Sequence, residues 1–241
     1  MTRAVIVAHG QPSDPAPAAA SLAALAADVA GHLPGWTITA ATLAEPGALA
    51  RATQGPTGRA YPLFMAGGWF TRVHLPARLA EAGAAGWHVL EPFGCDPALH
   101  ALAVTVTREA MTTHALAPAD TTLILAAHGS FKSPVPSDIA RLVARRIQTE
   151  TGVGRATAAF IDQTPALAQA SGCGRRSLCL PFFAAAGGHV TEDIPAALQT
   201  AGFQGHLLPA LGLDRRTPAL IAAAIRAGQP VCPRECRHRS D

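Results

Sequence analysis

Charged and aromatic side chains are both scarce in this chain of 241 residues. Asp, Glu, Lys and Arg together make up 15% of the sequence and aromatic residues 5%, whereas hydrophobic residues reach 49%. This composition excludes an intrinsically disordered protein and supplies enough apolar side chains for one large core or two smaller ones. The formal net charge of only +3 is far from the strongly basic balance of a dedicated nucleic-acid-binding protein. We therefore expect a folded protein without a nucleic-acid partner.

Segments that would direct the chain to a membrane are also missing. No apolar run is long enough to cross a bilayer, and the run that follows Arg3 is too short for the core of a signal peptide. The five cysteines are an odd number in a sequence without an export signal, which favours reduced thiols over a disulfide framework. We expect a cytoplasmic protein that does not interact with a membrane.

Two catalytic motifs are absent as well. The segment His128-Gly129-Ser130 offers a histidine and a serine, but the sequence lacks the Gly-x-Ser-x-Gly elbow with which an α/β hydrolase exposes its nucleophile. No predicted strand is followed by Gly-x-Gly-x-x-Gly, the turn that binds the pyrophosphate of a dinucleotide. The sequence therefore argues against a hydrolase and against a dinucleotide-dependent oxidoreductase.

An internal repeat organises the chain. Residues 5–10 match residues 124–129 at a shift of 119 residues, and the same shift superimposes residues 62–64 on residues 181–183. It also pairs three further sites: Pro46 with Pro165, Leu75-Pro76 with Ile194-Pro195, and Ala82-Gly83 with Ala201-Gly202. Self-similarity at one fixed shift indicates two homologous halves. We predict a diverged first half over residues 1–117, a second half over residues 118–231, and a Cys- and Arg-rich tail over residues 232–241.

Each half alternates predicted strands and helices. In the second half we expect strands at residues 121–127, 155–161, 177–183 and 206–209, and helices at residues 135–151, 190–201 and 215–227. Such alternation predicts an α/β protein of two similar Rossmann-like halves, each a parallel sheet with helices on both faces, with a cleft between the halves. Ligands of such sheets bind beyond the carboxyl ends of the strands.

Two histidines follow strands at this edge of the second sheet. His128 follows the first predicted strand, and His189 follows the third within Gly187-Gly188-His189. The neighbouring glycines permit tight turns and leave room for a bulky ligand. Neutral imidazole both binds divalent metal ions and accepts protons near neutral pH. His9 repeats the position of His128 in the first half, so the pattern points to this edge of each sheet as the functional one.

Three segments of the second half resemble the class II chelatases, which insert a metal ion into sirohydrochlorin during sirohaem and cobalamin synthesis. The segments are LAAHGS at residues 125–130, AFIDQTPAL at residues 159–167 and LPFFAAAGGHVTEDIP at residues 180–195. The first half is a diverged copy, so the resemblance covers nearly the whole chain up to about Gly228. It implies the chelatase fold and a sirohydrochlorin ferrochelatase or cobaltochelatase, a lyase.

The resemblance also implies roles for single residues. His128 and His189 would hold the metal ion and remove protons from the macrocycle. A carboxylate of the family falls at Asp162, which is one methylene shorter than the family's residue. The metal, Fe²⁺ or Co²⁺, would be a substrate, and no permanently bound cofactor is implied. Nitrogen ligands suit both ions, so the sequence leaves the choice between them open.

The first half departs further from the family pattern. It keeps His9, but Phe70 stands at the position of His189, and His74 stands at the position of Asp193. We therefore expect one main site, in the second half. The reverse assignment, with His9 and His74 as the metal-binding residues, stays open.

Sirohydrochlorin, the substrate that the resemblance implies, is a macrocycle with several carboxylates, so we expect cationic and aromatic residues to contact it. Candidates for substrate binding are Ser130, Lys132, Trp69, Phe70, Arg72, Arg78, Gly187 and Gly188, in addition to Asp162. Arg175 and Arg176, ahead of the third strand of the second half, are further candidates. With both repeats in one chain, we expect a monomer whose partners are sirohydrochlorin and a divalent metal ion.

Two further possibilities stay open. The loss of the second histidine in the first half also fits a non-catalytic tetrapyrrole or metal carrier with the chelatase fold. Cys232, Cys236 and His238 have a loose metal-binding spacing, so the tail could deliver metal.

Overall fold

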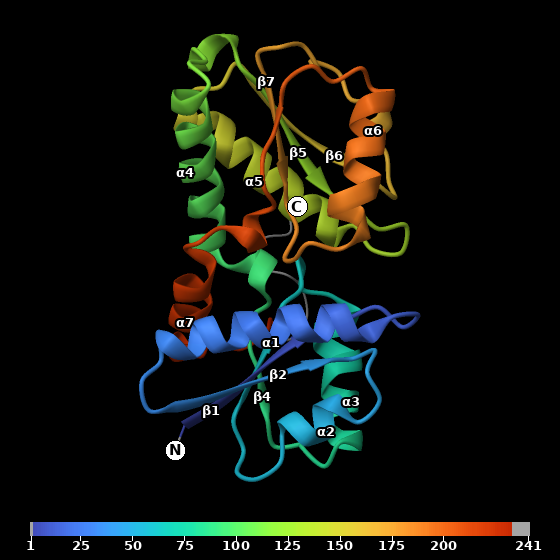
Figure 1. The fold of residues 1–241 in the computed structure, drawn as a ribbon, viewed down its shortest axis with the longest axis vertical. Coiled ribbons are helices and arrows are strands. Elements are labelled where there is room, and N and C mark those ends of the chain that lie inside the picture. The colour runs from blue at the N-terminus through green and yellow to red at the C-terminus, as the bar shows by residue number, and fades with distance from the viewer. Residues whose placement is uncertain (1, 233–241) are drawn as a thin grey trace. The chain divides into compact units, whose positions relative to one another are not determined.

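The computed structural model describes residues 2–232, and these form two compact units (Figure 1). The first unit consists of residues 2–96 together with residues 215–232, and the second of residues 97–214. Cys236 and His238 lie outside the described residues. Cys232 lies at the end of the described chain, where its Sγ is 4.0 Å from Oε1 of Glu91.

The first unit is built on a four-stranded parallel sheet with the strand order β2-β1-β3-β4. Its strands are β1 (Thr2–Ala8), β2 (Trp36–Thr42), β3 (Arg59–Pro62) and β4 (His88–Val89). Its helices are α1 (Pro15–Gly31), α2 (Ala48–Ala52), α3 (Leu75–Glu81) and α7 (Thr217–Ala227). A π-helical turn, Phe70–His74, leads directly into α3.

The second unit repeats this arrangement with the strand order β6-β5-β7-β8, again parallel throughout. Its strands are β5 (Thr122–Ala127), β6 (Arg155–Phe160), β7 (Ser177–Pro181) and β8 (His206–Leu207). Its helices are α4 (Pro97–Thr113), α5 (Val135–Thr151) and α6 (Ile194–Thr200). A second π-helical turn, His189–Asp193, leads into α6.

The first strand of each half, β1 or β5, lies inside its sheet and is buried on both faces. In β5, Ile124 and Ala126 pack into a core cluster with Ile194 and Leu198 of α6. Leu125, which points to the opposite face, is equally inaccessible to solvent, and α5 packs against this strand. Because a strand covered on both faces needs apolar side chains at every position, β5 appears in the sequence as an uninterrupted apolar run. The predicted α/β architecture of two similar halves with parallel sheets is confirmed.

The compact units divide the chain at different places from the sequence repeat. Helix α4 precedes residue 117, yet it packs against α5 in the second unit, and α7 packs against α1 in the first (Figure 1). Arg146 on α5 donates a hydrogen bond of 3.1 Å to the carbonyl oxygen of Pro97, at the start of α4. Arg226 on α7 donates one of 2.9 Å to the carbonyl oxygen of His32, just after α1. Each repeat therefore contributes its last helix to the other compact unit.

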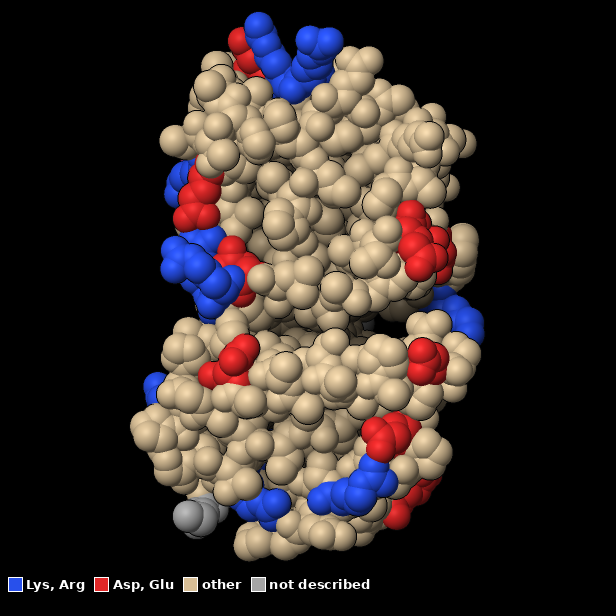
Figure 2. Space-filling model, viewed as in Figure 1, with Lys and Arg blue, Asp and Glu red and all other residues tan. Residues whose placement is uncertain are grey.

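The surface carries few charges. On the face that Figure 2 shows, charged side chains form small separate groups, and most of the surface is uncharged. None of the helices in residues 2–232 is long and apolar enough to cross a membrane. The four cysteines of this part of the chain, Cys95, Cys173, Cys179 and Cys232, form no disulfide.

Candidate active site

His128 is positioned by the end of β5 and by the turn that follows it. The strand ends at Ala127, and the next glycine, Gly129, has a φ of +77°. A Cβ atom at Gly129 would lie 2.8 Å from Cβ of Gln163, closer than real Cβ atoms approach. Only glycine meets both demands, because a left-handed backbone disfavours L side chains and the space is filled. The turn therefore fixes the backbone next to His128.

His189 is positioned by a π-helical turn rather than by a regular α-helix. The backbone N–H of Ile194 bonds to the carbonyl of His189, five residues earlier. Pro195 has no N–H to donate to the carbonyl of Thr191, and its ring would clash with this carbonyl in a regular helix, which favours the wider turn. The helix predicted over residues 190–201 is present, and its first turn is π-helical.

The two imidazole rings meet edge to face. The ring centroids of His128 and His189 are 4.6 Å apart, and the ring planes are inclined by 89°. Both side chains stay accessible, with 46% of His128 and 45% of His189 exposed to solvent. Two loops that are 61 residues apart in the chain thus bring two imidazoles into contact at the carboxyl edge of one sheet, where a ligand can reach both.

A carboxylate faces the Nδ1 atom of each imidazole. Nδ1 of His189 lies 2.6 Å from Oδ2 of Asp193, and Nδ1 of His128 lies 3.5 Å from Oδ2 of Asp162. Nδ1 of His128 is also 3.2 Å from the carbonyl oxygen of Gly129. A proton on Nδ1 suits these acceptors and leaves a lone pair on Nε2. In this tautomer each ring can bind a metal ion or accept a proton through Nε2.

Asp162 reaches this position through the backbone. Its N–H donates a hydrogen bond of 3.0 Å to the carbonyl oxygen of His128, so the loops after β5 and β6 run side by side. Asp193 reaches His189 because the two residues begin and end the same π-helical turn. The sequence analysis did not identify the pair of His189 and Asp193. The signal was present, because side chains four residues apart on a helix are neighbours.

The imidazoles of His128 and His189 do not belong to a metal site in which the protein supplies every ligand. Within residues 2–232, no group of three or more His, Cys, Asp or Glu side chains is arranged to hold a metal ion. Structural metal sites use about four protein ligands, whereas a site that must accept and release an ion keeps positions open. Two imidazoles with exposed faces therefore fit transient metal binding better than storage.

The other predicted residues of this edge differ in what they contact. Oγ of Ser130 accepts hydrogen bonds from the backbone N–H groups of Lys132 and Ser133, at 3.1 and 3.2 Å, so Ser130 builds the turn. Lys132 is exposed on the same turn. Gly187 and Gly188 are exposed, and a Cβ atom at either would meet nothing within 4 Å. The loop before His189 therefore leaves open space beside the histidines.

The first unit holds a related but different cluster. Phe70 lies where the second unit has His189, and its ring centroid is 5.1 Å from that of His9 and 5.2 Å from that of His74. Trp69 stacks on His74 with centroids 4.9 Å apart. Both Trp69 and Phe70 are exposed, at 59% and 36%. His9 and His74 thus each pack against Phe70, whereas His128 and His189 of the second unit pack against each other.

Both carboxylate positions have changed in the first unit. The N–H of Ala44 donates to the carbonyl of His9 at 3.0 Å, the same backbone hydrogen bond that Asp162 makes with His128. Ala44 therefore replaces the carboxylate of Asp162. The last residue of the π-helical turn is His74 in the first unit and Asp193 in the second. Of the four groups that meet in the second unit, the first unit keeps only the histidine at position 9.

The predicted arginines fall into two groups. Arg72 lies in the π-helical turn of the first unit, and Arg78, on α3, pairs with Glu81 at 3.3 Å. Arg176 precedes β7 and pairs with Asp120 at 2.8 Å, at the amino ends of β5 and β7. At about 3.3 Å per residue, β5 separates this edge from His128 by about 20 Å. Arg175 and Arg176 thus lie at the opposite edge of the sheet from His128 and His189.

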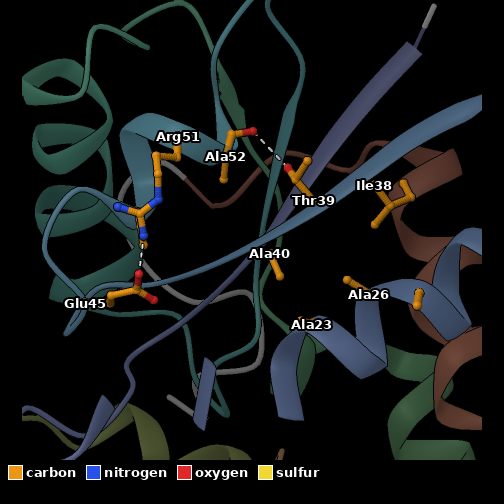
Figure 3. A pocket seen from close by; sticks show the side chains of 10 residues that line it. Ala23, Ala26, Ile38, Thr39, Ala40, Glu45, Arg51 and Ala52 are labelled. Atoms are coloured by element: carbon orange, nitrogen blue, oxygen red, sulfur yellow. Dashed lines mark hydrogen bonds and ion pairs between the residues drawn. The ribbon is translucent and has the colours of Figure 1, made fainter. Parts of the chain in front are cut away.

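A cavity of about 420 Å³ lies elsewhere in the first unit, along the edge strand β2 (Figure 3). Its walls are mainly alanines of α1, β2 and α2, and the carboxylate of Glu45 at its side is paired with the guanidinium of Arg51. Neither His9 nor His74 lines this cavity. It offers little chemistry for binding a metal ion or moving protons, so we place the candidate site at the histidines instead.

The chain is similar to a known protein family and to proteins of known structure. The CbiX family model matches residues 122–227. The chain is 47% identical to a protein whose structure is described as CbiX, the terminal enzyme for biosynthesis of siroheme in denitrifying bacteria, with a TM-score of 0.87. That similarity covers 93% of this chain and 98% of the other. No curated protein sequence gives a significant match.

Two more distant structures share the fold. SirB from Bacillus subtilis with Fe³⁺ is 15% identical, with a TM-score of 0.73 and full coverage of both chains. The sirohydrochlorin chelatase SirB from Bacillus subtilis subspecies spizizenii, in complex with cobalt, is 16% identical, with a TM-score of 0.68 and 95% coverage of both chains. At 15% and 16% identity, these similarities show a shared fold and nothing further.

Proposed function

Because the chain belongs to the CbiX family, we propose that it inserts a divalent metal ion into sirohydrochlorin, with His128 and His189 as the reacting side chains. The observation that carries this proposal is the contact between these two imidazoles, each backed at Nδ1 by a carboxylate.

Metal insertion exchanges two protons for one ion. The macrocycle loses the protons of two pyrrole N–H groups and gains M²⁺, so the site must offer the ion and accept the protons. An Nε2 lone pair serves either purpose. When an imidazole accepts a proton, the positive charge faces a carboxylate, Asp193 for His189 and Asp162 for His128. Because both rings are half exposed, they return the protons to solvent after each turnover.

We propose Fe²⁺ as the metal substrate. The relative that is 47% identical is described as the terminal enzyme of sirohaem synthesis, and sirohaem contains iron. Co²⁺ remains the second candidate, because nitrogen ligands suit both ions and affinity alone would favour Cu²⁺ or Ni²⁺ over either.

We also propose that the second half carries the main site. Its repeat counterpart lacks the second imidazole and both carboxylates, since Phe70, Ala44 and His74 stand in their places. A site built on His9 and His74 would have Phe70 in contact with both rings. Trp69 and Phe70, exposed on the first unit, offer apolar rings instead of metal ligands or proton acceptors.

Anaerobic metallation of sirohydrochlorin tests the proposal. The protein, at a concentration far below that of the substrate, is mixed with sirohydrochlorin and either Fe²⁺ or Co²⁺, and the absorbance of the macrocycle is followed. We expect many turnovers per protein molecule and a rate above that of the uncatalysed reaction, with Fe²⁺ preferred. A protein that binds sirohydrochlorin one to one without accelerating metal uptake would be a carrier, and this result would overturn the proposal.

A further inference from the structure

Phe131 is an aromatic side chain that folding leaves in water. Its relative exposure is 85%, the highest among the large exposed hydrophobic residues of the described chain. The ring lies three residues beyond His128, on the turn that joins β5 to α5. A phenylalanine at this exposure contributes almost nothing to the hydrophobic core. Its position therefore calls for an explanation other than folding.

The turn holds Phe131 firmly in spite of this exposure. On one side of it, the N–H of Ser130 donates a hydrogen bond of 3.0 Å to Oε1 of Gln163. On the other side, the N–H groups of Lys132 and Ser133 donate to Oγ of Ser130. Gly129 adds a backbone conformation that no other residue adopts easily. The backbone that carries the ring therefore loses little conformational freedom when a ligand binds.

Exposed apolar side chains collect on the loops at the carboxyl edges of the two sheets. Trp69, Phe70 and Val73 follow β3 in the first unit, and Phe131 follows β5 in the second. Phe131 lies three residues after His128, whereas Pro12 lies three residues after His9 in the first unit. An aromatic residue at this position therefore occurs only in the second unit, beside the histidine pair. The exposed ring of Phe131 beside the histidine pair therefore indicates an apolar ligand at this edge of the second sheet rather than a metal ion alone.

We infer that Phe131 binds the apolar ring system of the macrocycle and so positions it over His128 and His189. The inference rests on the proposed function, since it takes sirohydrochlorin as the ligand. The neighbouring ammonium group of Lys132 lies on the same exposed turn, where it can pair with a peripheral carboxylate of the substrate. Phe131 acts in binding and does not take part in proton transfer.

Binding of metal-free sirohydrochlorin tests this inference separately from catalysis. Dissociation constants are measured by anaerobic ultrafiltration for the wild-type protein and for Phe131→Ala, Phe131→Leu and Leu207→Ala. Leu207 is a matched control, because it is 42% exposed in the same unit but lies on the edge strand β8. We expect a dissociation constant about tenfold higher for Phe131→Ala, an intermediate value for Phe131→Leu, and no change for Leu207→Ala.

Kinetics and stability complete the test. In the metallation assay Phe131→Ala should raise KM by about the same factor as the dissociation constant, with kcat within about twofold of wild type. Its melting temperature should be unchanged because the ring is exposed. Unaltered binding by Phe131→Ala, or equal weakening by Leu207→Ala, would overturn the inference. If the wild-type protein binds sirohydrochlorin through Phe131 but does not turn over, the inference stands and the proposed function fails.

Discussion

The carboxylate of Asp193 lies 2.6 Å from Nδ1 of His189, within a single π-helical turn. This contact fixes the orientation of the ring and favours the tautomer with the proton on Nδ1. Replacing Asp193 by Asn keeps the shape but removes the charge, so we expect kcat for metallation to fall by about tenfold to a hundredfold.

The control for this change is Asp120→Asn. Asp120 also forms an ion pair, with Arg176, but at the amino edge of the sheet. The Asp120→Asn variant should leave kcat unchanged. A similar loss in both variants would mean that the effect of Asp193→Asn is not specific to the contact with His189.

The two halves should respond differently to the loss of their first histidine. His128→Ala removes one imidazole of the pair, and we expect metallation to slow by about a hundredfold or more, as is usual for the loss of a general base. His9→Ala should slow it by less than about tenfold, because its neighbour in the first unit is Phe70. The initial rates of both variants measure the difference, and equal or reversed losses would move the site to the first half.

A histidine at position 70 should not create a second active site. Phe70→His restores the imidazole that corresponds to His189, but Ala44 and His74 still replace the carboxylates. We therefore expect the double variant Phe70→His, His128→Ala to be as slow as His128→Ala alone. Recovery of even a tenth of wild-type activity in the double variant would show that the carboxylates are dispensable.

Gly129 should be sensitive to the addition of one methyl group. Its φ of +77° and the Cβ of Gln163, 2.8 Å from the position of an added Cβ, both oppose alanine. We expect Gly129→Ala to lower the free energy of unfolding by about 2 kcal/mol. Urea unfolding measures this against Gly174→Ala, where an added Cβ meets nothing within 4 Å. Equal stability of the two variants would contradict the account of the His128 turn.

Stability should decrease at alkaline pH. Burial raises the pKa of the Cys179 thiol to about 12, from 9.0 for an unperturbed thiol, and burial also raises the pKa of Tyr61 well above its ordinary value. As the pH rises through about 9, the unfolded chain releases the Cys179 proton while the folded chain keeps it, so the free energy of unfolding falls. The contribution of the thiol is complete below pH 9 and disappears as the pH approaches 12.

Urea unfolding at a series of pH values between 8 and 11 checks this prediction. The Cys179→Ala variant lacks the thiol and should lose less stability over the same range. Identical pH profiles for the variant and the wild type would rule out Cys179 as a cause of the decrease.

The fold could be predicted from the sequence because its determinants are local and repeated. Apolar runs such as residues 122–127 can be buried only in a sheet covered on both faces, and the predicted helix at residues 135–151 has the observed bounds. The candidate site could be placed at this edge because His128 directly follows β5 and His189 lies on the loop that follows β7. Topology alone then brings them to the same edge of the sheet.

What the sequence by itself determined is therefore the architecture, the repeat and the edge of the sheet where His128 and His189 lie, since these follow from hydrophobic periodicity and chain order. Tertiary structure alone decided which groups touch. It paired His189 with Asp193 through a π-helical turn, placed Arg176 about 20 Å away at the other edge, and exchanged α4 and α7 between the compact units. Such outcomes depend on hydrogen-bond geometry and packing between distant segments, which local patterns of residues do not encode.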